Sequence, residues 1–227
     1  MKKIEIALIV TLFFSGFINA QNTTTTEQLE PFNELKVFDQ INVKLVQSNK
    51  NYATISGDDT DEVSIVNNDG RLKIRMEIDN FLDGNKTYLT LYYTEDLQLV
   101  DANEGAKIKT DNKLKSNYLT LRAQEGAEID AVITSQNLNS KAVSGGEIKV
   151  SGTTDDQDIT IRSGGEYHSK GLESEKIDVA VFAGGMAKVT AKEYIDANVV
   201  AGGKIEIFGN PETVKQDKKL GGSIVMR

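Results

Sequence analysis

The sequence predicts an all-β protein, a right-handed parallel β-helix (a β-solenoid) with coils of roughly 19 residues. A glycine signature returns seven times between residues 104 and 223 at a nearly constant interval. Apolar and polar residues alternate in fixed phase around every copy. The composition agrees, because 19 Gly, 2 Pro and no Trp favour turn-rich β structure over helix bundles.

The repeat is the main evidence for a solenoid. Its first glycines are 21, 19, 19, 20, 18 and 19 residues apart. A fixed period of this size is typical of coils that bury their apolar face only against their neighbours. Propeller blades need about 40 residues, and no six-residue period indicates a left-handed hexapeptide helix. The copies are Glu104-Gly105-Ala106, Glu125-Gly126-Ala127, Ser144-Gly145-Gly146, Ser163-Gly164-Gly165, Ala183-Gly184-Gly185, Ala201-Gly202-Gly203 and Leu220-Gly221-Gly222.

The phase of the repeat predicts which side chains are buried. Side chains alternate across a strand, so residues at odd offsets from each first glycine should face the interior and those at even offsets the exterior. The glycines are predicted to mark a tight corner with little room for a Cβ and with unusual backbone angles. Offset +3 carries Ile108, Ile129, Ile148, Tyr167, Ala187, Ile205 and Ile224, and offset +4 carries Lys109, Asp130, Lys149, His168, Lys188 and Glu206.

The chain is expected to contain three segments. Residues 1–20 have a basic start, a short apolar run and a small residue before the break, as in a signal peptide. Residues 21–30 read as a polar tether, and residues 31–227 as a single all-β domain. Within it, 31–102 should hold N-terminal strands, a hairpin at 67–70 and a loop at 80–86, continuous with the Gly-Gly repeat solenoid at 103–227. Residues 153–158 should form another bend, and polar residues such as Lys218 should cap the final coil.

Charge and cysteine content bound the partners and the compartment. Cleavage after residue 20 leaves 24 basic and 33 acidic residues, a net charge of −9, which disfavours nucleic acid and anionic membranes as partners. The chain has no cysteine, hence no disulfide and no lipid-anchor cysteine. Its apolar run is shorter than the roughly 20 residues of a membrane span. We expect an exported protein of the periplasm, cell surface or extracellular space that is not an integral membrane protein.

No constellation of side chains indicates a reaction, so we expect no catalytic, cofactor-binding or metal-binding residues. His168 is the only histidine and belongs to an exterior ladder, and with no cysteine a zinc site is disfavoured. The acidic stretches 58–62 and 155–158 are expected to be solvated bends, and whether they bind calcium stays open. The glycine pairs lack the Gly-Lys-Ser/Thr of a phosphate loop.

Several of these features together resemble a known family. They are the opening strands at 32–46, the hairpin sequence Asn68-Asp69-Gly70-Arg71-Leu72-Lys73-Ile74, the repeated Ser/Ala-Gly-Gly corners, Gly209-Asn210-Pro211 and Gly221-Gly222-Ser223. The pattern is similar to the putative auto-transporter adhesin, head GIN domain family, which comprises secreted proteins common in Bacteroidetes. The resemblance covers roughly 32–225. It implies a β-helix-like all-β fold and, by the family's name, adhesion, and it assigns no functional residues.

The expected function is therefore non-enzymatic, with adhesin-like binding of a surface or glycan partner through a face of the β-helix. One alternative is a carbohydrate-active β-helix enzyme, a polysaccharide lyase or hydrolase that uses the acidic turns around residues 155–158. Another is a scaffold whose exposed ends or strands form homo-oligomers.

Overall fold

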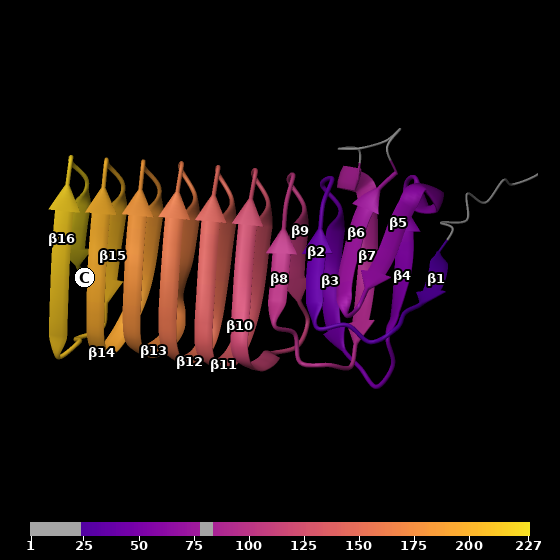
Figure 1. Ribbon diagram of the computed structural model, residues 1–227, viewed down its shortest axis with the longest axis horizontal. Coiled ribbons are helices and arrows are strands. Elements are labelled where there is room, and N and C mark those ends of the chain that lie inside the picture. Colours follow the sequence, from indigo (N-terminus) through magenta and orange to yellow (C-terminus); the bar gives the residue numbers. More distant parts are fainter. Residues whose placement is uncertain (1–23, 78–83) are drawn as a thin grey trace, which may run out of the picture.

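The computed structural model describes residues 24–77 and 84–227. The described residues form one sheet of 17 strands that winds into an elongated solenoid (Figure 1). Helical structure in these ranges is limited to the short 3-10 turns η1 (Thr60–Glu62) and η3 (Gly84–Lys86), and none of it could cross a bilayer. The predicted all-β solenoid is confirmed. The predicted signal peptide and most of the predicted 80–86 loop lie outside the described residues.

The strands lengthen from the N-terminal region into the repeats. The N-terminal strands are β1 (Thr25–Gln28), β2 (Glu34–Val37), β3 (Asn42–Gln47), β4 (Tyr52–Gly57), β5 (Val63–Asn68), β6 (Arg71–Met76) and β7 (Thr87–Tyr93). The repeat strands are β8 (Leu99–Ala102), β9 (Lys107–Thr110), β10 (Leu114–Gln124), β11 (Glu128–Val143), β12 (Glu147–Arg162), β13 (Glu166–Phe182), β14 (Met186–Val200), β15 (Lys204–Phe208), β16 (Thr213–Lys219) and β17 (Ser223–Met226).

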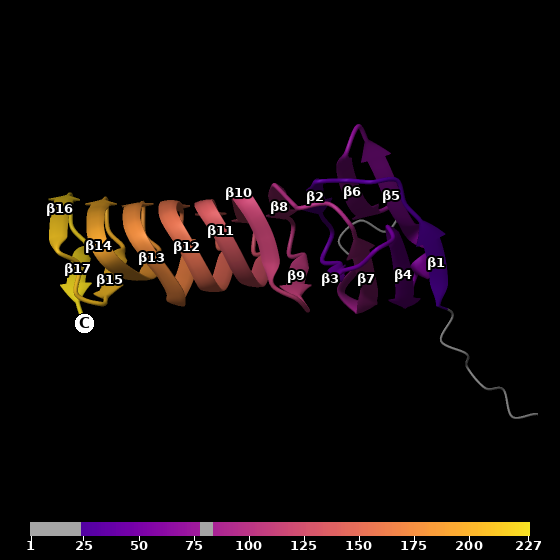
Figure 2. The same ribbon diagram turned by 90° about the horizontal axis from the view of Figure 1, so that it is seen from below.

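Successive coils pair in parallel and in register. Ile129 of β11 lies beside Ile148 of β12, which lies beside Tyr167 of β13. The odd offsets +3 and +5 are buried in every coil but the last, as the phase predicted. The long strands β11 to β14 wrap around the core (Figure 2). Each therefore supplies both halves of a coil, and the core is one continuous stack of aliphatic side chains.

The N-terminal region is continuous with the solenoid, as predicted, but its strands do not stack in sequence order. Strand β2 pairs with both β6 and β8, and β3 pairs with both β7 and β9. The β2–β3 coil therefore lies between the β6–β7 pair and the β8–β9 coil. The predicted hairpin is present as β5 and β6. Strand β1, inside the segment that composition assigned to a tether, pairs antiparallel with β4.

Every glycine signature forms a tight turn with positive φ at its first two residues, and in the last three copies the third residue, Gly185, Gly203 or Gly222, has positive φ as well. In the fourth copy, φ is 51° at Ser163 and 76° at Gly164. The Gly165 N–H donates to the Arg162 carbonyl over 3.1 Å and closes the turn. This is a type I′ turn, which requires positive φ at both central residues and so favours glycine at the second.

The steric reason predicted for the first glycine is wrong. A Cβ on Gly164 would meet no atom within 4 Å, so backbone conformation alone requires glycine there. The crowding falls on the next residue. A Cβ on Gly165 would lie 2.4 Å from the Ala142 carbonyl oxygen, because the coils stack closely at this edge. In this copy the two glycines therefore have different roles.

The bend opposite the turns carries buried hydroxyl groups. Ser116, Ser135, Thr154 and Ser174 occupy the same register position in four coils and are all buried. Thr154 Oγ1 lies 2.9 Å from Ser135 Oγ and donates to the Asp156 carbonyl over 3.3 Å. Such local bonds satisfy backbone groups where the chain changes direction. The alternation of buried and exposed residues in β12 breaks at Asp155 and Asp156, as expected for the predicted bend at 153–158, although β12 stays paired through it.

The two glycines can be separated by substitution. Gly165→Ala should lower the free energy of unfolding by about 1–3 kcal/mol, because the new Cβ overpacks against the Ala142 carbonyl. Gly164→Asn should cost less than about 1 kcal/mol, since asparagine tolerates the left-handed region. Urea unfolding followed by circular dichroism measures both, with Lys149→Ala as a surface control expected to cost no more than about 1 kcal/mol. A larger loss in Gly164→Asn than in Gly165→Ala would reverse the assignment.

Candidate functional site

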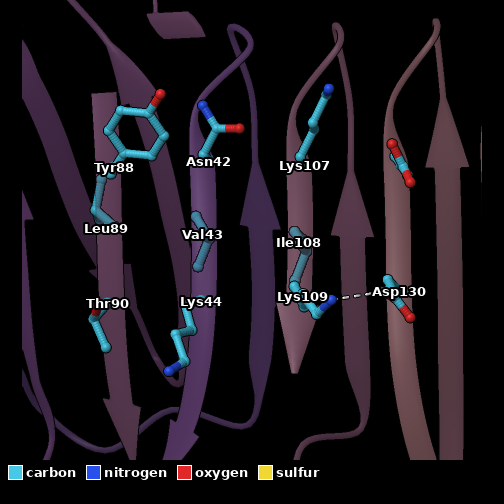
Figure 3. Close-up of a pocket in the computed structure, with 11 residues that line it drawn as sticks. Asn42, Val43, Lys44, Tyr88, Leu89, Thr90, Lys107, Ile108, Lys109 and Asp130 are labelled. Carbon is cyan, nitrogen blue, oxygen red and sulfur yellow. Dashed lines mark ion pairs between the residues drawn. The ribbon is translucent and has the colours of Figure 1, made fainter. Parts of the chain in front are cut away.

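A hollow of about 480 Å³ lies on the outer surface where the N-terminal region joins the repeats (Figure 3). It extends across four neighbouring strands, β7, β3, β9 and β11. We call it the Tyr88 groove. It is lined by Asn42, Val43, Lys44, Tyr88, Leu89, Thr90, Lys107, Ile108, Lys109, Glu128 and Asp130.

The strand register arranges these side chains in two outward rows. Tyr88 pairs with Asn42, Asn42 with Lys107, and Lys107 with Glu128, so these four form the first row. The second row lies two residues further along each strand and consists of Thr90, Lys44, Lys109 and Asp130. Neighbours within a row are about 4.8 Å apart, the spacing of hydrogen-bonded strands. The intervening Val43, Leu89 and Ile108 point into the core and are buried.

Tyr88 and Asn42 provide a fixed aromatic and amide surface. The Tyr88 side chain is 52% exposed, although it lies on a strand paired on both sides. Asn42 Nδ2 donates to the Asn85 carbonyl over 3.1 Å and to the Thr87 carbonyl over 3.4 Å. These bonds fix the amide, so its orientation does not have to be set when a ligand arrives.

The charges of the groove are paired with one exception. Lys44 Nζ lies 2.6 Å from Asp111 Oδ1, and Lys109 Nζ lies 3.2 Å from Asp130 Oδ2. Lys149 Nζ lies 2.9 Å from Glu128 Oε1 and also bonds to Glu147. These hydrogen bonds, first that to Glu128 and then that to Glu147, raise the pKa of Lys149. Within the described residues, Lys107 forms no ion pair of this kind. Lys107 therefore lies next to Asn42, which separates it from Tyr88, and the hydrogen-bonding capacity of its ammonium is directed to solvent.

The arrangement is suited to binding rather than to bond cleavage. An exposed aromatic ring, a fixed amide and an unpaired ammonium on rigid strands can contact a ligand by stacking and hydrogen bonds. Hydrolysis of a glycosidic bond instead needs two carboxyl groups with different protonation states across a substrate. Glu128 and Asp130, the carboxylates of the groove, are each held by a lysine.

The predicted acidic stretches lie elsewhere. Residues 58–62 form an exposed turn around η1, with Asp58 3.5 Å from Lys86 Nζ. Asp155, Asp156 and Asp158 are exposed on the outside of β12, whereas Gln157 between them is buried. There the register stacks Asp158 beside Asp178, and Asp178 beside Asp196. This carboxylate row borders a second hollow of about 340 Å³ with Tyr194 and Lys176 on its wall.

Stacking changes the acidity of the central member of this row. Partial burial, and then repulsion from Asp196, Asp158 and Asp156, raise the pKa of Asp178 above its ordinary value. Like charges opposite one another in a ladder destabilise the sheet. The row is thus a place of mild strain in the surface of the solenoid, and Lys215 on the next coil relieves it in part.

The structure also brings His168 to two carboxylates. His168 Nε2 lies 2.9 Å from Glu166 Oε2 and 3.3 Å from Glu147 Oε1, and one ligand atom of each residue falls within 4.8 Å of the others. Lys149 Nζ lies 3.0 Å from the same Glu147 oxygen. An ammonium group therefore already occupies the Glu147 carboxylate, and the cluster belongs to the exterior ladder expected for His168.

Sequence reasoning missed the Tyr88 groove because its strands are distant in sequence. β3 separates β7 from β9 in space, whereas β7 and β9 are closer to each other in sequence than either is to β3. The outward-facing Tyr88 in the strand 87–93 indicates a candidate binding surface, but the sequence does not indicate which strands lie beside it. The hydroxyl ladder did have a local signal, since Ser116, Ser135, Thr154 and Ser174 each precede a first glycine by the same interval.

The carboxylate row can be tested by titration. Because the pKa of Asp178 is raised in the folded state, its ionisation opposes folding, and the associated stability is lost as pH rises through that pKa. Asp196→Asn should lower the pKa of Asp178 and increase stability near neutral pH. NMR titration of the side-chain carboxyl carbons measures the shift, with Asp130→Asn as a distant control. An unchanged pKa in Asp196→Asn would contradict the account.

Known proteins share this architecture. A putative adhesin from Bacteroides fragilis NCTC 9343 matches with a TM-score of 0.83 and 22% identity over 92% of this chain and 98% of that chain. A putative adhesin from Parabacteroides merdae ATCC 43184 has a TM-score of 0.71 and 18% identity over 92% and 97% of the two chains. A protein from Parabacteroides distasonis ATCC 8503, described as a putative lipid binding protein, matches with a TM-score of 0.68 and 20% identity over 92% of this chain and 98% of that chain.

At these identities the structural likeness shows the fold alone. No curated protein matches this chain. The family described as putative auto-transporter adhesin, head GIN domain matches residues 31–211, which is most of the sequence and agrees with the resemblance in the repeats. The chain belongs to this family.

Proposed function

We propose that the protein is a non-enzymatic binding protein of the cell envelope that holds a surface glycan in the Tyr88 groove. The observation that carries the proposal is the combination of a half-exposed Tyr88 ring and the unpaired Lys107 ammonium in one row of a rigid sheet. A sugar ring can stack on the aromatic face while its hydroxyl groups bond to the amide and the ammonium. Membership of a family named for adhesion supports this reading.

The scaffold suits repeated contact with an extended ligand. The outward rows continue from the Tyr88 groove along the solenoid, so that Lys107 is followed in register by Glu128, Glu147 and Glu166. Side chains held on paired strands need little ordering when a ligand binds. The predicted signal peptide fits an exported protein at the periplasm or the cell surface. Adhesive binding there needs no catalytic groups or cofactors.

A glycan array followed by calorimetry on the best ligand tests the proposal. Tyr88→Ala and Lys107→Ala should each weaken binding about tenfold or more, equivalent to about 1.4 kcal/mol. Tyr118→Ala is the matched control, because Tyr118 is 69% exposed and lies in β10, on the half of a coil that precedes its turn, whereas the repeat residues of the groove follow a turn. It should leave the affinity unchanged.

Two outcomes would contradict the proposal. Equal losses in Tyr118→Ala and Tyr88→Ala would show that the groove is not the site. Cleavage of a polysaccharide, with or without calcium, that disappears in an Asp156→Ala/Asp158→Ala double variant would instead support the carbohydrate-active enzyme. The same incubations with the array ligands, analysed for new reducing ends or unsaturated products, distinguish the two functions.

A further inference from the structure

The last coil of the solenoid presents open strand edges. Strand β16 pairs on one side with β14, and β17 pairs on one side with β15. Among residues 24–77 and 84–227 no strand lies beyond them. All seven residues of β16 are exposed, and Val214 and Met226, which continue the apolar interior, are 38% and 45% exposed. A free edge of this kind is a template for pairing with another strand.

The hydrogen bonds already formed identify which backbone groups are free. The Lys219 carbonyl accepts from the Ala201 N–H over 2.9 Å, so Lys219 faces the solenoid. Successive residues of a strand point their N–H and C=O groups to opposite sides. Val214, Gln216 and Lys218 therefore direct these groups outward. In β17, the Ser223 and Arg227 N–H groups bond inward to Gly203 and Ile207, which leaves Ile224 and Met226 facing outward.

We propose that this end of the solenoid binds a second copy of the same chain by antiparallel pairing of β16 with β16 and of β17 with β17. A two-fold axis through Gln216 sets Gln216 opposite its own copy and Val214 opposite Lys218 of the other chain. Every outward-facing backbone group of β16 then has a partner. In the last coil, β16 and β17 lie before and after the turn at Leu220-Gly221, and residues equally far from this turn face each other across the coil. The two-fold axis through Gln216 therefore also passes through β17 near Val225. About this axis, Ile224 of one chain pairs with Met226 of the other.

Charge supports this register. With Gln216 on the axis, Lys215 of each chain lies directly opposite Asp217 of the other, in the narrow pairs where side chains approach most closely. Both side chains occupy even offsets from Gly221 and so project outward, beside the interface edge. Lys219, which bonds to Asp217 over 2.9 Å within one chain, lies opposite the neutral Thr213. No two like charges are placed opposite one another in β16.

The N-terminal end does not present the same surface. There β4 and β5 pair antiparallel with β7 and β6, and β1 pairs antiparallel with β4. These strands lie obliquely to the coils (Figure 1). The C-terminal end of one chain therefore cannot stack on the N-terminal end of another by parallel coil-on-coil pairing. The assembly closes as a symmetric dimer instead of an open filament.

Charge reversal tests the register, with sedimentation equilibrium over a range of concentrations as the measurement. The native protein should show a reversible monomer–dimer equilibrium. Lys215→Asp and Asp217→Lys should each raise the dissociation constant about tenfold or more, because each sets like charges opposite one another twice. The double variant Lys215→Asp/Asp217→Lys should restore dimerisation. Lys219→Ala removes the bond within the chain without touching the proposed pair, and it should dimerise like the native protein.

A backbone variant provides a second test. In Gln216→Pro the lost N–H is one that faces outward, so the fold should persist by circular dichroism while the dimer is abolished. A monomer at all concentrations in the native protein overturns the proposal. So does a dimer that is indifferent to these variants, a failure of the double reversal to rescue, or an assembly larger than two chains.

Discussion

Hydrogen bonding between equivalent residues of successive coils is the constraint on which the rest of the structure depends. It requires every coil to return to the same position around the solenoid axis, one strand spacing further along, and in the first four copies a type I′ turn with two residues of positive φ meets this requirement. The close approach of coils at that edge then restricts the next position, so Gly146 and Gly165 face backbone atoms of the preceding coil. Core, outward rows and open end all follow from this register.

Local patterns were enough to predict the solenoid but not the contacts that fix its details. Alternation around each first glycine identified the buried positions, and the Asp69-Gly70 turn identified the β5–β6 hairpin. The partners of buried polar groups were not predictable. Tyr167 was assigned to the interior, yet its bond to Gln157 Oε1 at 2.6 Å depends on the bend in another part of the coil. The insertion of β2 and β3 between later strands is a long-range choice of the same kind.

This long-range choice also creates the candidate site. Because β3 lies between β7 and β9, Tyr88 is brought into the same row as Lys107, the first lysine of the repeats. Elsewhere the outward rows are mostly ion-pair ladders, such as Lys149 with Glu128 and Glu147. The glycine signature, which invites interpretation as a binding motif, serves the backbone. The side chains that remain available for recognition are on the outer faces.

The repeat is a structural unit set by register, and excision of one coil tests this. Deleting residues 126–144 joins Glu125 to Gly145, keeps the type I′ turn and removes one whole coil. This variant should remain folded and should unfold cooperatively in calorimetry. Deleting residues 126–135 removes only half a coil and should abolish cooperative unfolding, because the side chains and hydrogen bonds of the following strands lose their partners. Equal tolerance of the two deletions would show that the coil is not the structural unit.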